Sequence, residues 1–330
     1  MALIGSYPVM QVRPYGLLVY EQKEFDTIRA FNRSRVSNSI VQYTGVLTPF
    51  AKKNLKRAVS LLVASAKEKE ATNFKTGKQF SFKLNFITFT LPAIQEQKND
   101  EQIKICLDNW IKRAKRKYKL NNYVWRAERQ ANGNIHFHMV SDTWIHYENI
   151  RSDWNEVLQP TGLVNKYTEK HQQLSLTQYL QLYPPNTKIS KAARIVAYKR
   201  GCATQWKNPN TTDVHAIHKI KNLTSYFIKY MSKAHKEGEE PIKGKVWDCS
   251  QNLKTKKNCW FHLQGAALQT WEYCYNKLEL EKITDPLFTI IFIPTAKFSQ
   301  YICKEIRDVW EEYLKGIREG FQTPVECSAQ

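Results

Sequence analysis

Two histidines separated by one bulky residue directly follow a tight-turn sequence, and this stretch constrains the fold more than any other. Asn132-Gly133 is a typical turn pair between antiparallel strands. Side chains alternate between the two faces of a strand, so a strand over residues 135–140 places His136 and His138 on one face and Phe137 on the other. The pattern predicts a β-hairpin with two adjacent imidazoles. They are either half of a metal site or solvent-facing side chains on a half-buried strand.

A third metal ligand would come from the preceding predicted strand, residues 123–129, where Glu128 is one candidate and Gln130, just beyond it, is the other. A two-residue turn pairs His138 with Ala127 and directs Glu128 away from the histidines. A three-residue or bulged turn pairs His138 with Glu128 instead. We predict this odd turn, which places a carboxylate beside both imidazoles and suits a divalent ion such as Mg²⁺ or Mn²⁺.

The charge of the chain indicates a polyanionic partner. Fifty Lys and Arg residues against thirty Asp and Glu residues give a net charge of +20. Three segments, 104–119, 188–207 and 214–236, together hold a single acidic residue, whereas residues 270–320 hold nine acidic and seven basic residues. Ordinary solvated helix faces are the alternative. We therefore expect nucleic acid as the partner, bound by the middle of the chain.

Composition excludes several classes of protein. The seven cysteines include no C-x-x-C pair, which favours a reducing compartment over a disulfide framework. The first residues lack the features of a signal peptide, and no apolar run approaches the ~20 residues of a membrane span. Thr76-Gly77-Lys78 lacks the other residues of a phosphate-binding loop. We expect an intracellular, soluble protein that has no ATP site.

Periodicity predicts an α+β fold, with an antiparallel sheet and flanking helices. Residues 1 to about 47 are expected to be irregular or to form short strands, and the polar segment 159–188 shows little readable structure. The predicted strands are 81–90, 123–129, 135–140, 212–220 and 287–293. The predicted helices are 49–67, 104–118 (apolar contacts from Ile105, Leu107, Trp110 and Ile111), 147–158, 223–231, 265–280 and 296–318.

A predicted helix that begins after Asn222 carries a second candidate for chemistry. Tyr226 and Tyr230 are four residues apart, so they lie on one helix face, about 6 Å from each other. Packing in the core would explain both tyrosines, but a row of lysines accompanies them: Lys229, Lys233 and Lys236. A tyrosine that faces a metal-bound phosphate and is assisted by a cation can act as a nucleophile, although its free pKa is about 10.

Together these residues resemble the HUH endonucleases, specifically the rolling-circle replication initiators of small single-stranded DNA phages and related bacterial plasmids. Residues 86–92 resemble the first motif of that family, and Glu128 with the turn and the paired histidines resembles its metal motif. Residues 226–230 resemble its Tyr-x-x-Lys-Tyr motif, and residues 245–253 are similar to a downstream stretch of the phage-type members. The resemblance spans residues 86–253, with a long insertion between the histidines and the tyrosines.

The resemblance implies a metal-dependent tyrosine DNA endonuclease and strand transferase with an HUH/RRM-like core. His136, His138 and Glu128 would hold Mg²⁺ or Mn²⁺. Tyr226 and Tyr230 would be the nucleophiles, and Lys229 would contact the phosphate. The product would be a 5′-phosphotyrosyl intermediate and a free 3′-hydroxyl, which are rejoined later in rolling-circle replication. A relaxase or single-strand transposase shares this chemistry, and the alternative from another class is a non-catalytic, basic protein that binds single-stranded DNA.

The implied partners are single-stranded origin DNA, with or without a hairpin, and a host helicase or other replication proteins, in the cytoplasm of a bacterial host cell. The basic helix 104–119, with exposed aromatic residues such as Trp206, would provide a phosphate track and base stacking. The expected domains are an N-terminal accessory segment (1–80), a nuclease domain (81–236) and a C-terminal accessory region (237–330).

Overall fold

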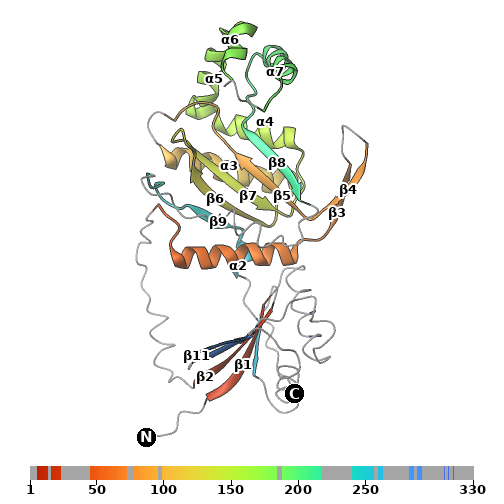
Figure 1. Cartoon of the computed structure of the whole chain (residues 1–330), viewed down its shortest axis with the longest axis vertical. Helices are drawn as coiled ribbons and strands as arrows, with labels where there is room; N and C mark the ends of the chain where they lie inside the picture. The colour runs from red at the N-terminus through yellow and green to blue at the C-terminus, as the bar shows by residue number, and fades with distance from the viewer. Residues whose placement is uncertain are drawn as a thin grey trace. The chain divides into compact units, whose positions relative to one another are not determined.

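The computed structural model describes two compact units, which we name the terminal unit and the central unit (Figure 1). The terminal unit comprises residues 1–41, 63–67 and 251–330, and the central unit comprises residues 42–62 and 68–250. The structure describes residues 6–13, 16–23, 45–72, 77–95, 99–183, 188–217, 240–255, 259–262, 282–285 and 288–291, and positions 308, 311 and 315. Within that part of the chain, no helix has the length and hydrophobicity needed to cross a membrane.

The terminal unit contains a five-stranded antiparallel sheet in the order β10-β1-β2-β12-β11. Its strands are β1 (Ser6–Arg13), β2 (Gly16–Lys23), β10 (Cys259–His262), β11 (Lys282–Asp285) and β12 (Phe288–Ile291). The short strands expected near the N-terminus are therefore present as a hairpin, and the strand predicted at 287–293 is confirmed as β12. Strand pairing joins segments from the two ends of the chain.

A second five-stranded antiparallel sheet, in the order β8-β5-β7-β6-β9, forms the middle of the central unit (Figure 1). Its strands are β5 (Leu84–Phe89), β6 (Tyr123–Arg129), β7 (Ile135–Ser141), β8 (Thr212–Ile217) and β9 (Trp247–Cys249). A separate hairpin precedes it, made of β3 (Lys69–Thr72) and β4 (Gln79–Phe82). The predicted α+β class with an antiparallel sheet and flanking helices is confirmed.

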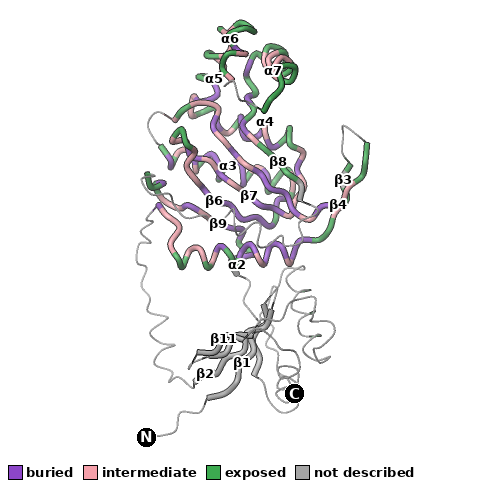
Figure 2. The backbone as a smooth tube through the Cα atoms, viewed as in Figure 1, coloured by how far each residue is buried: buried purple, intermediate pink, exposed green. Residues whose placement is uncertain are grey.

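Two helices, α3 (Asp100–Tyr118) and α4 (Tyr147–Leu158), pack against one face of this sheet. The helix α3 begins where the side chain of Asn99 accepts a hydrogen bond from the Gln102 amide, and acidic residues occupy its first turn. The core between helices and sheet holds large aromatic side chains that are fully buried: Phe89, Trp110, Phe137 and Trp154 (Figure 2). Burial of each contributes about 1.5–3 kcal/mol to folding.

The helix α2 (Pro49–Ser65) also matches its prediction, because the expected apolar stripe Leu55, Val59, Leu62 and Val63 is buried. In α3, Leu107, Trp110 and Ile111 are buried as expected. Ile105 was wrongly assigned to the core: its side chain is 57% exposed, and Ile103 is buried in its place. A stripe that extends by i, i+4 steps from Ile103 to Leu107 and Ile111 leaves Ile105 on the outer side.

The segment 159–188, expected to show little structure, is largely helical. It contains a 3-10 turn, η1 (Gln159–Thr161), and the helices α5 (Leu163–Gln172) and α6 (Leu176–Gln181), followed by α7 (Lys191–Ala203), which was also not predicted. These helices gather at one end of the central unit (Figure 1). They lack a continuous aliphatic stripe, so hydrophobic periodicity does not reveal them.

Candidate metal centre

The turn between β6 and β7 fixes which side chains share a sheet face. The Gln130 amide donates to the Asn134 carbonyl at 2.8 Å, which closes a loop of three residues, Ala131 to Gly133. The side-chain oxygen of Asn132 accepts from the Asn134 amide at 3.1 Å. Gly133 has a φ of 82°, a left-handed conformation that glycine adopts without steric cost. The predicted odd turn is confirmed.

The register that follows pairs Glu128 with His136 and Arg126 with His138. The carboxylate therefore lies on the histidine face, as predicted, but its direct partner is His136. The predicted pairing with His138 is wrong by two residues, because the loop includes Ala131 and closes at Gln130. A shift of two residues preserves the face of every side chain, so the predicted grouping remains correct.

Glu128, His136 and His138, the metal triad, have ligand atoms within 4.8 Å of one another. The Glu128 Oε2 atom lies 3.6 Å from His136 Nε2 and 3.5 Å from His138 Nε2. Atoms that bind one ion at about 2.1 Å are roughly 3.0–3.5 Å apart, so this spacing is close to that of ligands around a divalent cation. The buried Nε2 of His136 has no hydrogen-bond partner, which an ion would correct. The triad fits a divalent metal ion.

Strand β5 holds the ring of His138. Thr88 lies directly opposite His138, and its Oγ1 is 3.1 Å from His138 Nδ1. The ring of Phe86 stacks on the same imidazole, with centroids 5.4 Å apart and an interplanar angle of 28°. When Nδ1 donates its proton to Thr88, the Nε2 lone pair faces the carboxylate and is available to a cation. Sequence reasoning identified the segment 86–92 by resemblance but assigned no role to Thr88.

Charge at the triad favours cation binding. Burial raises the pKa of Glu128, but the two histidine rings and the Arg126 guanidinium outweigh it and hold that pKa well below its usual range. Arg126 Nη1 lies 3.3 Å from Glu128 Oε1, and its side chain is 6% exposed. Glu128 is therefore ionised at neutral pH. Arg126 shares the triad face because it is two residues before Glu128 on one strand.

The opposite face of the same strands is apolar. Phe137 and Met139 alternate with the histidines and are fully buried in the core that α3 and α4 cover. The basic helix α3 thus lies on the face away from the triad. Two of its cations are engaged by α4: Arg113 with Glu156 at 2.5 Å, and Lys117 with Asp153 at 2.9 Å. The expectation that Trp206 is exposed for base stacking is wrong, because this residue is only 5% exposed.

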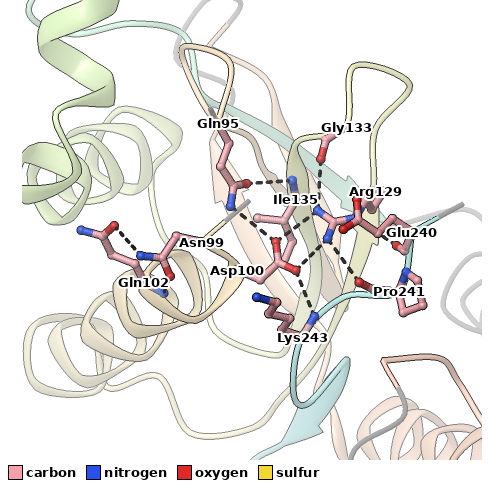
Figure 3. A network of polar contacts seen from close by, with 10 residues as sticks. All are labelled: Gln95, Asn99, Asp100, Gln102, Arg129, Gly133, Ile135, Glu240, Pro241 and Lys243. Atoms are coloured by element: carbon pink, nitrogen blue, oxygen red, sulfur yellow. Dashed lines mark hydrogen bonds and ion pairs between the residues drawn. The ribbon is translucent and has the colours of Figure 1, made fainter. Parts of the chain in front are cut away.

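A buried polar network anchors the end of the hairpin that carries the triad (Figure 3). Arg129, the residue after Glu128, points to the other face and forms an ion pair with Asp100 of α3 at 2.7 Å. Its Nε donates to the Glu240 carbonyl at 3.0 Å, and the Lys243 amide donates to Asp100 at 3.0 Å. The network therefore joins α3, the hairpin and the segment that leads to β9.

The predicted nucleophile residues Tyr226, Lys229 and Tyr230 lie outside the described residues, as does the helix predicted at 223–231. The structure thus brings together the three predicted metal ligands, and the roles of the tyrosines and the lysine stay predictions. The alternative ligand Gln130 closes the turn through its backbone.

Comparison with known proteins adds a family to this geometry. Residues 84–235 match the family described as Replication-associated protein ORF2. The matched segment begins at the first residue of β5 and includes the whole metal triad and both tyrosines. No curated protein and no solved structure matches the chain. Residues 84–235 are accordingly a domain of the Replication-associated protein ORF2 family, a family of rolling-circle replication initiators.

Proposed function

We propose that this chain initiates rolling-circle replication by nicking one DNA strand at an origin through a tyrosine nucleophile and later rejoining the ends. The observation that carries the proposal is the cluster of Glu128, His136 and His138 on one face of a sheet within an initiator domain. A purely structural role does not account for it, because an ionised carboxylate and two imidazoles converge and leave a buried Nε2 without a hydrogen bond.

The residues of the triad would bind Mg²⁺ or Mn²⁺ through Glu128 Oε2 and the two Nε2 atoms. When bound, the ion supplies a positive charge that polarises the scissile phosphate. The protein contributes a carboxylate that is ionised at neutral pH, because the histidine rings and Arg126 lower its pKa. It also contributes a fixed ring at His138, which Thr88 and Phe86 hold in place. The ligands sit on paired strands, which keeps their geometry before DNA binds.

The proposed cleavage step uses Tyr226 or Tyr230. The phenolic oxygen bonds to phosphorus as the bond between phosphorus and the 3′ oxygen breaks. The phenol loses its proton, and the 3′ oxygen gains one to become a free hydroxyl. The energy of the phosphodiester is kept in the 5′-phosphotyrosyl bond, so rejoining requires no ATP. Lys229 would neutralise the phosphate, and a pair of tyrosines lets one hold the first DNA end while the other cleaves.

The test is a covalent-adduct experiment with random-sequence, single-stranded oligonucleotides and Mn²⁺, run on a denaturing gel. A label at the 3′ end of the DNA should migrate with the protein, and a label at the 5′ end should not. Changing both Tyr226→Phe and Tyr230→Phe should abolish the adduct and leave DNA binding intact, whereas Glu128→Gln should abolish it through loss of the metal. An adduct that persists in the double variant would refute the assignment of the nucleophiles.

Two other outcomes would redirect the proposal. A non-catalytic binding protein would bind single-stranded DNA with strong salt dependence and leave it uncut. A relaxase or single-strand transposase would form the same adduct, and would differ in its DNA substrate. We further propose that a host helicase and other replication proteins unwind the DNA, since the matched family segment extends only from residue 84 to residue 235.

A further inference from the structure

The insertion between the histidines and the predicted tyrosines forms a small helical module, residues 163–207, which contains α5, α6 and α7. Its centre is Trp206, whose ring lies 5.1 Å from His171, 5.4 Å from Tyr179 and 5.6 Å from Tyr198, between ring centroids. Trp206 and the preceding residue have positive φ values of 59° and 52°, which turn the chain back against the helices. The aromatic side chains of the module are thus used in its interior.

The helix α7 presents a basic surface to solvent. Its inner side carries Arg194, whose guanidinium lies over the Tyr183 ring, and Tyr198, whose hydroxyl donates to the Leu174 carbonyl. Its outer side carries Lys191, Lys199 and Arg200, all exposed. Among the described ion pairs, none involves these three residues. The segment 188–207 has six basic residues and no acidic residue, and Glu169 is the only acidic residue of the module.

The module is attached to the sheet at the end where the triad lies. The Thr90 amide, just after β5, donates to the Thr211 carbonyl at 2.8 Å. The buried Asn155 of α4 donates to Asn208 and accepts from Thr211, each at 2.6 Å. One residue into β8, Asp213 pairs with Thr88, which in turn pairs with His138. Buried hydrogen bonds therefore fix the return from the module close to the metal ligands in the sheet register.

We propose that the solvent-facing side of α7 binds the phosphate backbone of double-stranded DNA beside the site of cleavage. The proposal deepens the proposed function and rests on it, because it names a duplex segment as part of the substrate. Three cations without acidic neighbours complement a polyanion. Single-strand binding sites stack bases on exposed aromatic rings, but the rings of this module pack on one another, and α7 exposes Ala192, Val196 and charged residues. This surface therefore suits a duplex.

The direct test measures binding to a fluorescent duplex of about two helical turns by anisotropy, in EDTA so that no cleavage occurs. The variant Lys199→Ala/Arg200→Ala should bind on the order of tenfold more weakly near 0.1 M salt, and its slope of log affinity against log salt should fall by about two contacts. Lys112→Ala/Arg116→Ala on α3 is a matched control, because it removes the same charges from an exposed helix surface. That control should bind as the wild type does.

A second variant, Val196→Glu, places an acid among the same cations at a position that is 50% exposed, and should weaken duplex binding without loss of fold. Duplex affinity equal to that of the wild type, equal losses in the α3 control, or an equal loss for single-stranded DNA would each overturn the proposal. Adduct formation on a short single strand should be unchanged in the α7 variants. Because the binding assay needs no chemistry, failure of the nicking proposal and failure of duplex binding give separate results.

Discussion

Asp100 and Arg129 form a bidentate ion pair in the interior of the central unit. Arg129 Nη1 lies 3.1 Å from Asp100 Oδ1, and Nη2 lies 2.7 Å from Oδ2 (Figure 3). The side chains are 4% and 0% exposed. The pair connects the first turn of α3 to the last residue of β6, so it holds the turn that sets the register of the triad. Buried charges of this kind depend on each other.

We expect Asp100→Asn to lower the free energy of unfolding by about 3–5 kcal/mol, because it leaves the Arg129 guanidinium buried without its counter-charge. Urea unfolding followed by circular dichroism measures the change. The matched control is Glu156→Gln, which removes the exposed partner of Arg113 and should cost about 0–1 kcal/mol. Equal unfolding midpoints for Asp100→Asn and the wild type would show that the pair contributes little.

The hydrogen bond between Thr88 and His138 predicts an effect on metal affinity without DNA. Thr88→Val keeps the shape of the side chain and removes the hydroxyl that orients the imidazole, so Mn²⁺ binding should weaken by about 10–100-fold. Thr88→Ser keeps the hydroxyl and should bind nearly as the wild type does. Titration calorimetry with Mn²⁺ distinguishes them. If the Val and Ser variants bind Mn²⁺ equally, Thr88 has no role in positioning the ring.

The depressed pKa of Glu128 predicts how stability changes with pH in metal-free protein. Because the folded pKa lies below the unfolded value of about 4.3, the carboxylate contributes stability above that pH, and this contribution is lost as the pH falls further. The urea midpoint of the wild type should therefore decline between about pH 5 and 3. In Glu128→Gln that part of the decline should be absent, and parallel pH curves for the two proteins would contradict the prediction.

Gly201 gives a prediction whose sign separates packing from helix propensity. In an open helix, Gly→Ala stabilises by about 0.5–1 kcal/mol. A Cβ atom on Gly201 would lie only 2.3 Å from the nearest atom of the Trp206 ring, so Gly201→Ala should lower the stability of the helical module and alter tryptophan fluorescence. Ala203→Gly, at an exposed position of α7, is the control for propensity alone. A stabilised Gly201→Ala protein would rule out the tight contact.

The sequence predicts those elements whose burial follows a simple period. The strands β6 and β7 and the helices α3 and α4 each alternate or repeat apolar residues at the spacing of their structure, and all four are confirmed. The faces of Glu128 and the histidines also follow, since only the parity of the turn matters. The pairing partner does not, because Ala131 carries no signal that it belongs to the turn.

The helical module and the supporting residues were beyond such reasoning. Trp206 is buried by a left-handed backbone turn and by rings brought from three helices, and no local pattern encodes that contact. Thr88 and Arg126 act on the triad through cross-strand neighbours, which are known only once the register is known. The Asp100–Arg129 pair joins residues far apart in the sequence, and each alone looks like an ordinary surface charge.

The terminal sheet has a consequence for how the chain acquires its structure during synthesis. Strands β1 and β2 end at Lys23, yet β1 pairs with β10, which begins at Cys259, and β2 pairs with β12. At about 5–20 residues per second, the ribosome takes on the order of ten seconds to a minute to make the chain between them. The central unit, complete at Ser250, can fold in that interval. The first hairpin must wait for partners that emerge last.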